Sequence, residues 1–268
     1  MKYFLDTEFI EGTQKNWRIK TKKPTIDLIS IGIVSEDNRE YYAISKDFNL
    51  KEAWNRWQQR TGQGDRNNHE PKEYWIRENV LKTIFIDFLK LQAEYLIKQR
   101  RITGYAPPLD TQFTYSNFKK LLNRFGKSNK EIAKKVLLFV NDGYCKEETT
   151  RLQAEESYSL YKAIEFVKGK TEVEFYAYYA AYDWVVFCWL FGKMIDLPKG
   201  FPMFSRDLKV MLDDKLSKSS NYGYLKGTLE DNLKLIKKRL DYPVQNNCHN
   251  ALNDARWNLA LFNFINRL

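Results

Sequence analysis

Three segments with the residue pattern of β-strands lie near the start of the chain, the first two separated by 16 residues and the last two by four. They run from Lys2 to Phe9, from Ile26 to Val34 and from Arg39 to Ile44, and the last two are joined by the turn-forming triplet at residues 36–38. Because strands joined by a short turn pair antiparallel, we expect an antiparallel three-strand meander. The polar, basic stretch from Gly12 to Lys23 is expected to form a hairpin loop within it.

The middle of the chain changes to a helical pattern. From Leu50 onward apolar residues recur three and four apart, through LKEAWNRWQQR and again through EYWIRENVLKTIFIDFLKLQAEYLIKQRR, until the stretch from Ala106 to Thr114 interrupts them. Ser128 and Glu131 form a capping-box pattern ahead of IAKKVLLFV, which predicts a helix start. A further helix is predicted over Thr150 to Val167.

The last hundred residues return to a strand followed by helices. Thr171 to Tyr179 is rich in β-branched and aromatic residues, and it leads through Asp183 into the apolar run Trp184 to Phe191. A loop over residues 218–227 and a helix from Thr228 to Leu240 follow. The closing segment ALNDARWNLALFNFINRL has helical spacing throughout. Strands early and late, with helices between and after them, predict an α/β fold.

Composition favours a globular chain with a polyanionic partner. The 268 residues are 43% hydrophobic and 15% aromatic, enough for a sizeable core. Lysine and arginine number 44 against 34 acidic residues, a net charge of +10, so nucleic acid is the first partner to consider. A basic balance also arises from lysine-rich solvated faces, so charge supports this interpretation without deciding it.

The cysteines and the apolar runs indicate in which cellular compartment the protein is expected. Cys145, Cys188 and Cys248 are far apart and form no CxxC pair, which argues against a disulfide framework and against a thiolate zinc site. We therefore expect a reducing, cytoplasmic setting. The apolar run before Asp6 is too short for a signal peptide, and the longest apolar stretch, Val185 to Phe191, is too short to span a bilayer. No membrane partner is expected.

Asp6 and Glu8 are the first candidates for a metal site. They lie two residues apart on a predicted strand, so both carboxylates project from one face and Thr7 and Phe9 from the other. Two adjacent negative charges favour a cation, and oxygen ligands suit hard divalent ions such as Mg²⁺ or Mn²⁺. Taken alone, an Asp-x-Glu pair at a strand end is also common on ordinary exposed surfaces.

Asp183, His249 and Asp254 are candidates whose local patterns leave alternatives open. Asp183 starts a predicted helix, where a carboxylate also serves as a simple cap. His249 precedes Asp254 by five residues, about 140° around a regular helix. The two can converge only if His249 lies on a loop or a distorted first turn, which the polar run DYPVQNNCHN favours.

These motifs together resemble a known enzyme family. DTEF at residues 6–9, AAYDWVVF at residues 180–187 and CHNALNDAR at residues 248–256 are similar to the three motifs of the DEDDh exonucleases of the RNase H-like superfamily. YFLDTEFIEG, IDLISIGIVSEDNREYYAIS, YYAAYDWVV and HNALNDAR most resemble the bacterial polyadenylate-specific 3′-exoribonuclease AS family, relatives of RNase T and oligoribonuclease. The match covers residues 1–55 and about 125–268. The interval of residues 56–124 is longer than the corresponding interval expected for the family. It is predicted to be a helical insertion in a single domain of residues 1–268.

The resemblance implies a fold and a set of roles. The fold would be an RNase H-like mixed sheet, in which parallel strands extend the antiparallel meander and helices flank it. Asp6, Glu8 and Asp254 would bind one of two Mg²⁺ or Mn²⁺ ions, Asp6 would bridge to the second, and Asp183 would complete the acidic cluster. His249 would be the general base, since an imidazole can accept a proton near neutral pH. The family implies removal of 5′-nucleoside monophosphates from RNA 3′ ends, with frequent homo-oligomers.

The substrate-binding residues and the substrate class have alternatives that the sequence leaves open. The neighbourhood of Asp6 contacts the terminal nucleotide in related exonucleases, so Thr7 and Phe9 are candidate substrate-binding residues, although alternation places Phe9 in the core. The same chemistry on single-stranded DNA is an alternative, because pocket detail decides whether the 2′-hydroxyl is recognised. A nucleic-acid-binding domain without turnover is a second alternative. The complete set of four acidic residues and one histidine argues against it.

Overall fold

A mixed five-stranded sheet organises the chain. The computed structural model describes residues 1–16, 21–59, 72–141, 172–218 and 228–268. The strand order is β3-β2-β1-β6-β7, and the strands span β1 Lys2–Asn16, β2 Thr21–Ser35, β3 Glu40–Ile44, β6 Glu174–Ala177 and β7 Arg206–Asp207. The expected α/β fold with a mixed sheet is confirmed.

Short and long connections explain the two kinds of pairing in this sheet. The strands β1, β2 and β3 follow one another through connections of only four residues, which forces antiparallel neighbours. In contrast, β6 pairs parallel to β1, with Tyr3 opposite Phe175, and β7 pairs parallel to β6, with Tyr176 opposite Arg206. The predicted meander is therefore present, and the late strand lies beside the first one.

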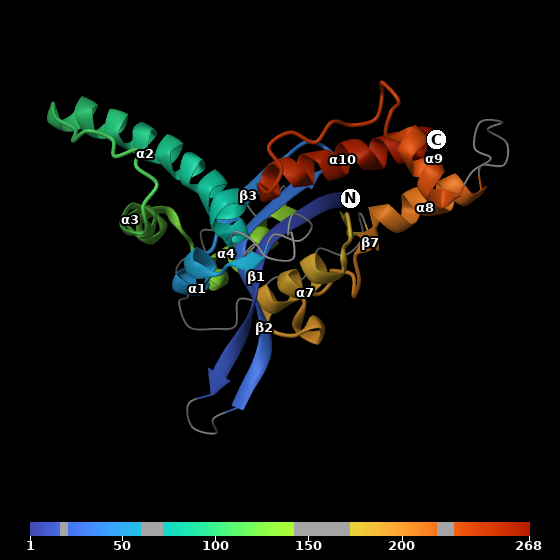
Figure 1. Cartoon of the computed structure of the whole chain (residues 1–268), viewed down its shortest axis with the longest axis horizontal. Coiled ribbons are helices and arrows are strands. Elements are labelled where there is room, and N and C mark those ends of the chain that lie inside the picture. Colours follow the sequence, from blue (N-terminus) through green and yellow to red (C-terminus); the bar gives the residue numbers. More distant parts are fainter. Residues whose placement is uncertain (17–20, 60–71, 142–171, 219–227) are drawn as a thin grey trace, which may run out of the picture. The chain divides into compact units, whose positions relative to one another are not determined.

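The first two strands are longer than their apolar residues predict. β1 and β2 each have 15 residues and form the long strand pair visible in Figure 1. The hairpin loop expected from Gly12 to Lys23 is therefore wrong for most of its length: β1 runs to Asn16 and β2 begins at Thr21. Periodicity detects burial of side chains, whereas strand pairing needs only backbone donors and acceptors, so a polar sequence can continue the ladder.

The described residues group into two compact units. One, termed unit 1, contains Met1–Thr7, Ile31–Tyr42 and Asn129–Leu268, and the other, termed unit 2, contains Glu8–Ser30 and Ala43–Ser128. Each unit contains one part of β1 and one part of β2. Each unit has its own packed interior.

Helices cover both faces of the sheet in unit 1. They are α4 Asn129–Val140, α7 Ala181–Phe191, α8 Leu208–Lys218, α9 Leu229–Ile236 and α10 Ala251–Arg267, with a short 3₁₀ turn, η2, at Met194–Asp196. Neighbouring residues of β6 point to opposite faces. Phe175 packs against Trp184 and Phe187 of α7, while Tyr176 joins Phe4 in a cluster with side chains of α8 and α10.

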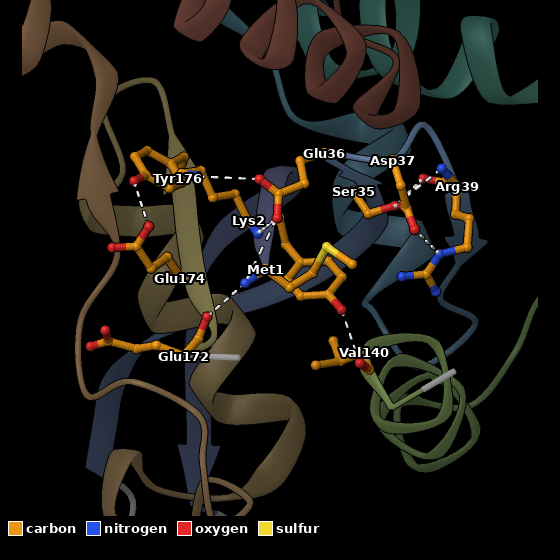
Figure 2. A network of polar contacts seen from close by, with 11 residues as sticks. Met1, Lys2, Ser35, Glu36, Asp37, Arg39, Val140, Glu172, Glu174 and Tyr176 are labelled. Carbon is orange, nitrogen blue, oxygen red and sulfur yellow. Dashed lines mark hydrogen bonds and ion pairs between the residues drawn. The ribbon is translucent and has the colours of Figure 1, made fainter. Parts of the chain in front are cut away.

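A polar network holds the beginning of β1 in place (Figure 2). The Met1 amine donates to the carbonyl of Glu172 at 2.8 Å, and the Lys2 side chain pairs with Glu36 at 3.2 Å. The Tyr3 hydroxyl donates to the carbonyl of Val140 at the end of α4. These contacts connect β1 to the segment before β6, to the turn after β2 and to α4.

The helices of unit 2 pack around aromatic rings. They are α1 Leu50–Asn55, a π-helical turn η1 Ile76–Leu81, α2 Lys82–Thr103 and α3 Tyr115–Phe125, and a small ladder joins β4 Gln58–Gln59 to β5 Lys72–Glu73. Phe113 lies 4.8 Å from Trp54 and 5.2 Å from Phe85, between ring centroids. Gly104 ends α2 in a left-handed conformation, with φ 73°, and Thr114 caps α3.

Several helix predictions are confirmed in position and corrected in length. The helix expected over residues 50–60 ends at Asn55, because Arg56 is extended and Gln58–Gln59 pairs with β5. The helix expected from Thr228 to Leu240 ends at Ile236, since the following residues are exposed and have no apolar face to bury. The helix predicted over residues 150–167 and the loop over 218–227 fall almost wholly outside the described residues. Within those residues, no helix has the length and apolar character needed to cross a bilayer.

Candidate metal centre and active site

The terminal helix is fixed to the first strand by one buried side chain. The Asn258 side-chain amide donates to the carbonyl of Leu5 at 2.9 Å. Asp254 lies four residues earlier on α10, so it occupies the same helix face one turn away. Because Leu5 directly precedes Asp6, this contact brings Asp254 to the strand positions that carry the early carboxylates.

A glycine in the second strand allows the helix to approach this closely. A Cβ atom added to Gly32 would lie 2.2 Å from the carbonyl oxygen of Ala251, the first residue of α10. Glycine inside a strand commonly marks such a close backbone approach. Gly32 lies within the segment IDLISIGIVSEDNREYYAIS that carries the resemblance, where no role was predicted for it, although its place within the apolar run ISIGIVS is a usable signal.

Three carboxylates meet at this position. Asp6, Glu8 and Asp254 each offer one carboxylate oxygen, and these oxygens all lie within 4.8 Å of one another. Asp6 and Glu8 are half-buried and Asp254 is buried. Like charges held this close repel one another, whereas a hard divalent cation bound between them would offset the repulsion. The donor chemistry therefore fits Mg²⁺ or Mn²⁺.

Both oxygens of Asp254 accept hydrogen bonds from the loop before α10. The Gln245 side-chain amide donates to Oδ1 at 2.6 Å, and the backbone N–H of His249 donates to Oδ2 at 2.9 Å. Burial raises the pKa of Asp254 above its usual value, and these two hydrogen bonds oppose that shift. Gln245 thus contacts the candidate ligand directly, although it lies outside the motifs that predicted the site.

His249 lies outside the helix that carries Asp254. It has a left-handed backbone with φ 66°, and Asn250 after it is the N-cap of α10, whose side chain accepts from the N–H of Asn253. This is the break in helical regularity that the five-residue spacing requires. His249 and Asp254 are therefore neighbours through a backbone hydrogen bond as well as in sequence.

Asp183 lies in the first turn of α7 and reaches across to β1. Its Oδ1 accepts from the backbone N–H of Thr7 at 2.8 Å and from the Thr7 hydroxyl at 2.6 Å. The side chain is only 7% exposed, and this burial raises the pKa of Asp183 to about 6 despite the bonds from Thr7. Among the described residues Asp183 is not part of the three-carboxylate group, but it binds the residue between Asp6 and Glu8.

Thr7 and Phe9, the remaining candidates from the first strand, differ in burial. Thr7 is buried and bound to Asp183, whereas Phe9 is half-buried. Alternation along β1 places both on the strand face opposite Asp6 and Glu8.

Aromatic residues connect the β6–α7 corner to the terminal helix. Tyr178 packs edge-on against Trp257 of α10 at 5.1 Å between ring centroids, and Tyr179 beside it is left-handed, with φ 57°. The Trp257 indole N–H donates to the carbonyl of Pro243 at 3.0 Å, which attaches the loop before α10 to the helix. Asp207 also supports the corner by accepting from the N–H of Ala180 at 3.0 Å. Tyr178, Tyr179 and Ala180 lie in the motif segment YYAAYDWVV, whereas Trp257, Pro243 and Asp207 lie outside the motifs.

Comparison with known proteins identifies relatives over most of the chain. No protein-family model matches it. The chain is 27% identical over 215 residues to 3′-5′ exoribonuclease Rv2179c of Mycobacterium tuberculosis strain H37Rv, and equally to 3′-5′ exoribonuclease MT2234.1 of strain CDC 1551. Each match covers 80% of this chain and 76% of the relative. The resemblance to 3′-5′ exoribonucleases is thereby confirmed: over four-fifths of its length the chain is similar to proteins that carry that name.

Proposed function

We propose that the protein is a 3′-5′ exoribonuclease of the DEDDh type that uses two divalent metal ions. The convergence of Asp6, Glu8 and Asp254 from an early strand and the terminal helix carries this proposal. The similarity to proteins named 3′-5′ exoribonucleases supports the same activity. RNA is the preferred substrate class because both relatives are named for it.

The three gathered carboxylates would hold the metal. Asp6, Glu8 and Asp254 would bind one ion, Asp6 would also contact the second, and Asp183 would complete the site. When bound, divalent cations at these carboxylates would stabilise the negative charge that develops on a phosphate during hydrolysis. Bonds from Gln245 and the His249 N–H already orient Asp254 for such a role.

His249 would act as the general base. Its imidazole would take the proton of the attacking water, whose oxygen forms a new bond to the terminal phosphorus. The bond from that phosphorus to the 3′ oxygen of the preceding nucleotide breaks, and this oxygen takes up a proton. The product is a 5′-nucleoside monophosphate and an RNA one nucleotide shorter. His249 lies on the loop beside Asp254, and this position supports its role as the general base.

Other parts of the proposal concern substrate and assembly. Phe9 and Thr7 are the candidates for contact with the terminal nucleotide. Thr7 would contribute mainly through its hydrogen bonds to Asp183, which hold that carboxylate in place. We also propose one catalytic domain over residues 1–268, with residues 56–124 inserted in it, and a homo-oligomer. Size-exclusion chromatography with light scattering tests the last point.

The central test follows labelled nucleic acid over time. RNA and single-stranded DNA carrying a 5′ label are incubated with protein and Mg²⁺ or Mn²⁺, or with EDTA. We expect stepwise shortening of RNA from its 3′ end, loss of this activity in EDTA and in Asp6→Asn, and normal activity in Glu11→Gln. Glu11 is an exposed acid of the same strand on the opposite face, so it is a matched control.

The outcomes separate the alternatives. Shortening of DNA at the higher rate would favour the single-stranded DNA exonuclease. Binding of RNA without any shortening would favour a nucleic-acid-binding domain without turnover. Equal activity of wild type and Asp6→Asn would show that the three-carboxylate group is not required for cleavage.

A further inference from the structure

The helix pair α2–α3 of unit 2 carries an uneven share of the positive charge. Residues 82–125 contain eight lysines and arginines against three acidic residues, a net charge of +5. This is half of the chain's +10 in about a sixth of its residues. Figure 1 shows α2 as one long helix with α3 after it.

All eight of these cations have exposed side chains. Two of them, Lys82 and Lys90, pair with acids on the same helix face, at 3.9 Å and 3.0 Å. The other six form no ion pair with another residue that the structure describes. We call these six the α2–α3 basic surface, and they are Lys98, Arg100, Arg101, Lys119, Lys120 and Arg124.

Of the three acids of this region, Glu94 is exposed and lies four residues before Lys98 on α2, and the other two have partners outside the surface. Asp87 pairs with Lys90, and Asp110 accepts from the side chain of Asn117 at 2.7 Å and from the N–H of Gln112 at 3.1 Å. Helix α3 contains no acidic residue at all. An ordinary solvated helix mixes both signs of charge at spacings of three and four residues.

Two spacings in the surface are unfavourable for the isolated helices. Lys120 and Arg124 are four residues apart on α3, and Lys98 and Arg101 are three apart on α2. Like charges at these spacings destabilise a helix. A polyanion bound along the surface would offset this repulsion, and features that break a local rule commonly belong to functional surfaces.

An arginine–tyrosine stack joins the two helices within this surface. The guanidinium carbon of Arg124 lies 3.6 Å from the ring centroid of Tyr95 on α2. The stack orders the guanidinium while it remains exposed, which suits it to a phosphate. Tyr105, just beyond the end of α2, is 69% exposed and offers a ring face to a base. Helices α2 and α3, with the segment between them, thus carry both exposed cations and an accessible aromatic ring.

We propose that the α2–α3 basic surface binds the sugar-phosphate backbone of single-stranded RNA. This inference rests on the proposed function, because it assigns to the surface the body of the strand whose 3′ end is shortened. The three α2 cations of the surface lie within the last six residues of that helix, and its three α3 cations lie within six residues of one another, so the surface offers two groups of three charges to the phosphates. The helices would then hold the RNA without contributing to bond cleavage.

The test measures RNA binding in EDTA, where no cleavage occurs. The variant is Lys119→Ala with Lys120→Ala, since both side chains are exposed and alanine favours the helix. Anisotropy of fluorescein-labelled single-stranded RNA gives the dissociation constant between 50 mM and 200 mM salt. Loss of two phosphate contacts should reduce the salt slope by about 1.4, so the affinity ratio across this range becomes about sevenfold smaller.

A matched control removes the same charge elsewhere. Lys237→Ala with Lys238→Ala changes two exposed lysines of unit 1 directly after α9, and it should bind RNA like the wild type. An unchanged slope in the α3 variant, an equal loss in the control variant, or tighter binding of duplex DNA than of single-stranded RNA would each overturn the inference. Circular dichroism verifies that both variants are folded.

Turnover distinguishes this inference from the proposed function. With Mg²⁺, the α3 variant should degrade a dinucleotide at the wild-type rate but should show a raised KM for long RNA. If the wild type degrades no RNA yet binds it through Lys119 and Lys120, the proposed function fails and the binding surface stands. If the variant degrades RNA normally and its KM for long RNA is unchanged, the inferred RNA-binding role of the surface is wrong, whereas the proposed exoribonuclease function is supported.

Discussion

The side-chain amide of Asn258 bonds to the backbone carbonyl of Leu5 at 2.9 Å, and this buried contact sets the register between α10 and β1. Asn258 is 1% exposed, so no solvent can replace the lost partner. We expect Asn258→Ala to lower the free energy of unfolding by about 1 to 3 kcal/mol, the cost of an unsatisfied buried carbonyl. Urea denaturation of the metal-free protein measures this loss.

The same variant should also weaken metal binding, because Asp254 is one turn away on α10. Asn263→Ala is the matched control, since Asn263 lies on the same helix with an exposed side chain. Isothermal titration with Mn²⁺ should show weaker binding for Asn258→Ala alone. Equal stability of the two variants would mean that the Asn258 bond does not fix the register.

The close approach of Gly32 to Ala251 predicts a steric effect. In Gly32→Ala the new methyl group would lie 2.2 Å from a backbone oxygen, which cannot move without shifting the start of α10. We expect a loss of about 3 kcal/mol or more and a lower melting temperature by scanning calorimetry. Gly12→Ala on β1 meets nothing nearer than 3.5 Å and should cost much less. A Gly32→Ala protein as stable as Gly12→Ala would contradict the packing described.

How much of this arrangement the sequence could predict depends on the range of the interaction. Alternation along one strand placed Asp6 and Glu8 on the same face, and their oxygens do gather with that of Asp254. Period and turn chemistry are local, so they also located the meander, the β6–α7 corner and α10. These features follow from residues within a few positions of one another.

Contacts between distant segments had no such signal. The Thr7–Asp183 bonds join residues 176 positions apart, and the Gln245–Asp254 bond depends on the path of an irregular loop. The length of the β1–β2 strand pair was missed because its outer part is paired by backbone groups, which every sequence carries. Hydrophobic periodicity shows which residues of an element are buried, but it does not show which elements they contact.

Burial of Asp183 predicts a dependence of stability on pH in the metal-free protein. The pKa of Asp183 is raised to about 6 from an ordinary value of 3.8, chiefly by burial. The folded state therefore carries a penalty for the charged form that is complete above about pH 6 and absent below the unfolded value. We expect Asp183→Asn to stabilise the protein at pH 8 by about 2 to 3 kcal/mol.

This gain should decline as the pH falls through 6 and should be small near pH 4. Urea denaturation in EDTA at several pH values measures it, and the Thr7 donors remain available to the amide oxygen of the new side chain. Asp196→Asn, an exposed acid of the η2 turn, is the control and should show no such profile. An Asp183→Asn protein that is less stable than the wild type at pH 8 would show that the carboxylate is not penalised by burial.

The backbone of His249 determines which variant tests its role. With φ 66° the residue is left-handed, a conformation that asparagine tolerates better than alanine. His249→Asn keeps the backbone N–H that bonds Asp254, so it removes the imidazole and leaves that contact in place. We expect kcat on RNA to fall by about 10²- to 10⁴-fold, the usual contribution of a general base.

Metal affinity separates the roles of a base and a ligand. In His249→Asn the Mn²⁺ dissociation constant from isothermal titration should stay within a few-fold of the wild type, whereas Asp254→Asn should lose both binding and activity. If His249→Asn loses metal binding to the same extent, the imidazole is a ligand. If kcat is unchanged, another group accepts the proton, and His249 contributes to the site through contacts such as the bond from its N–H to Asp254.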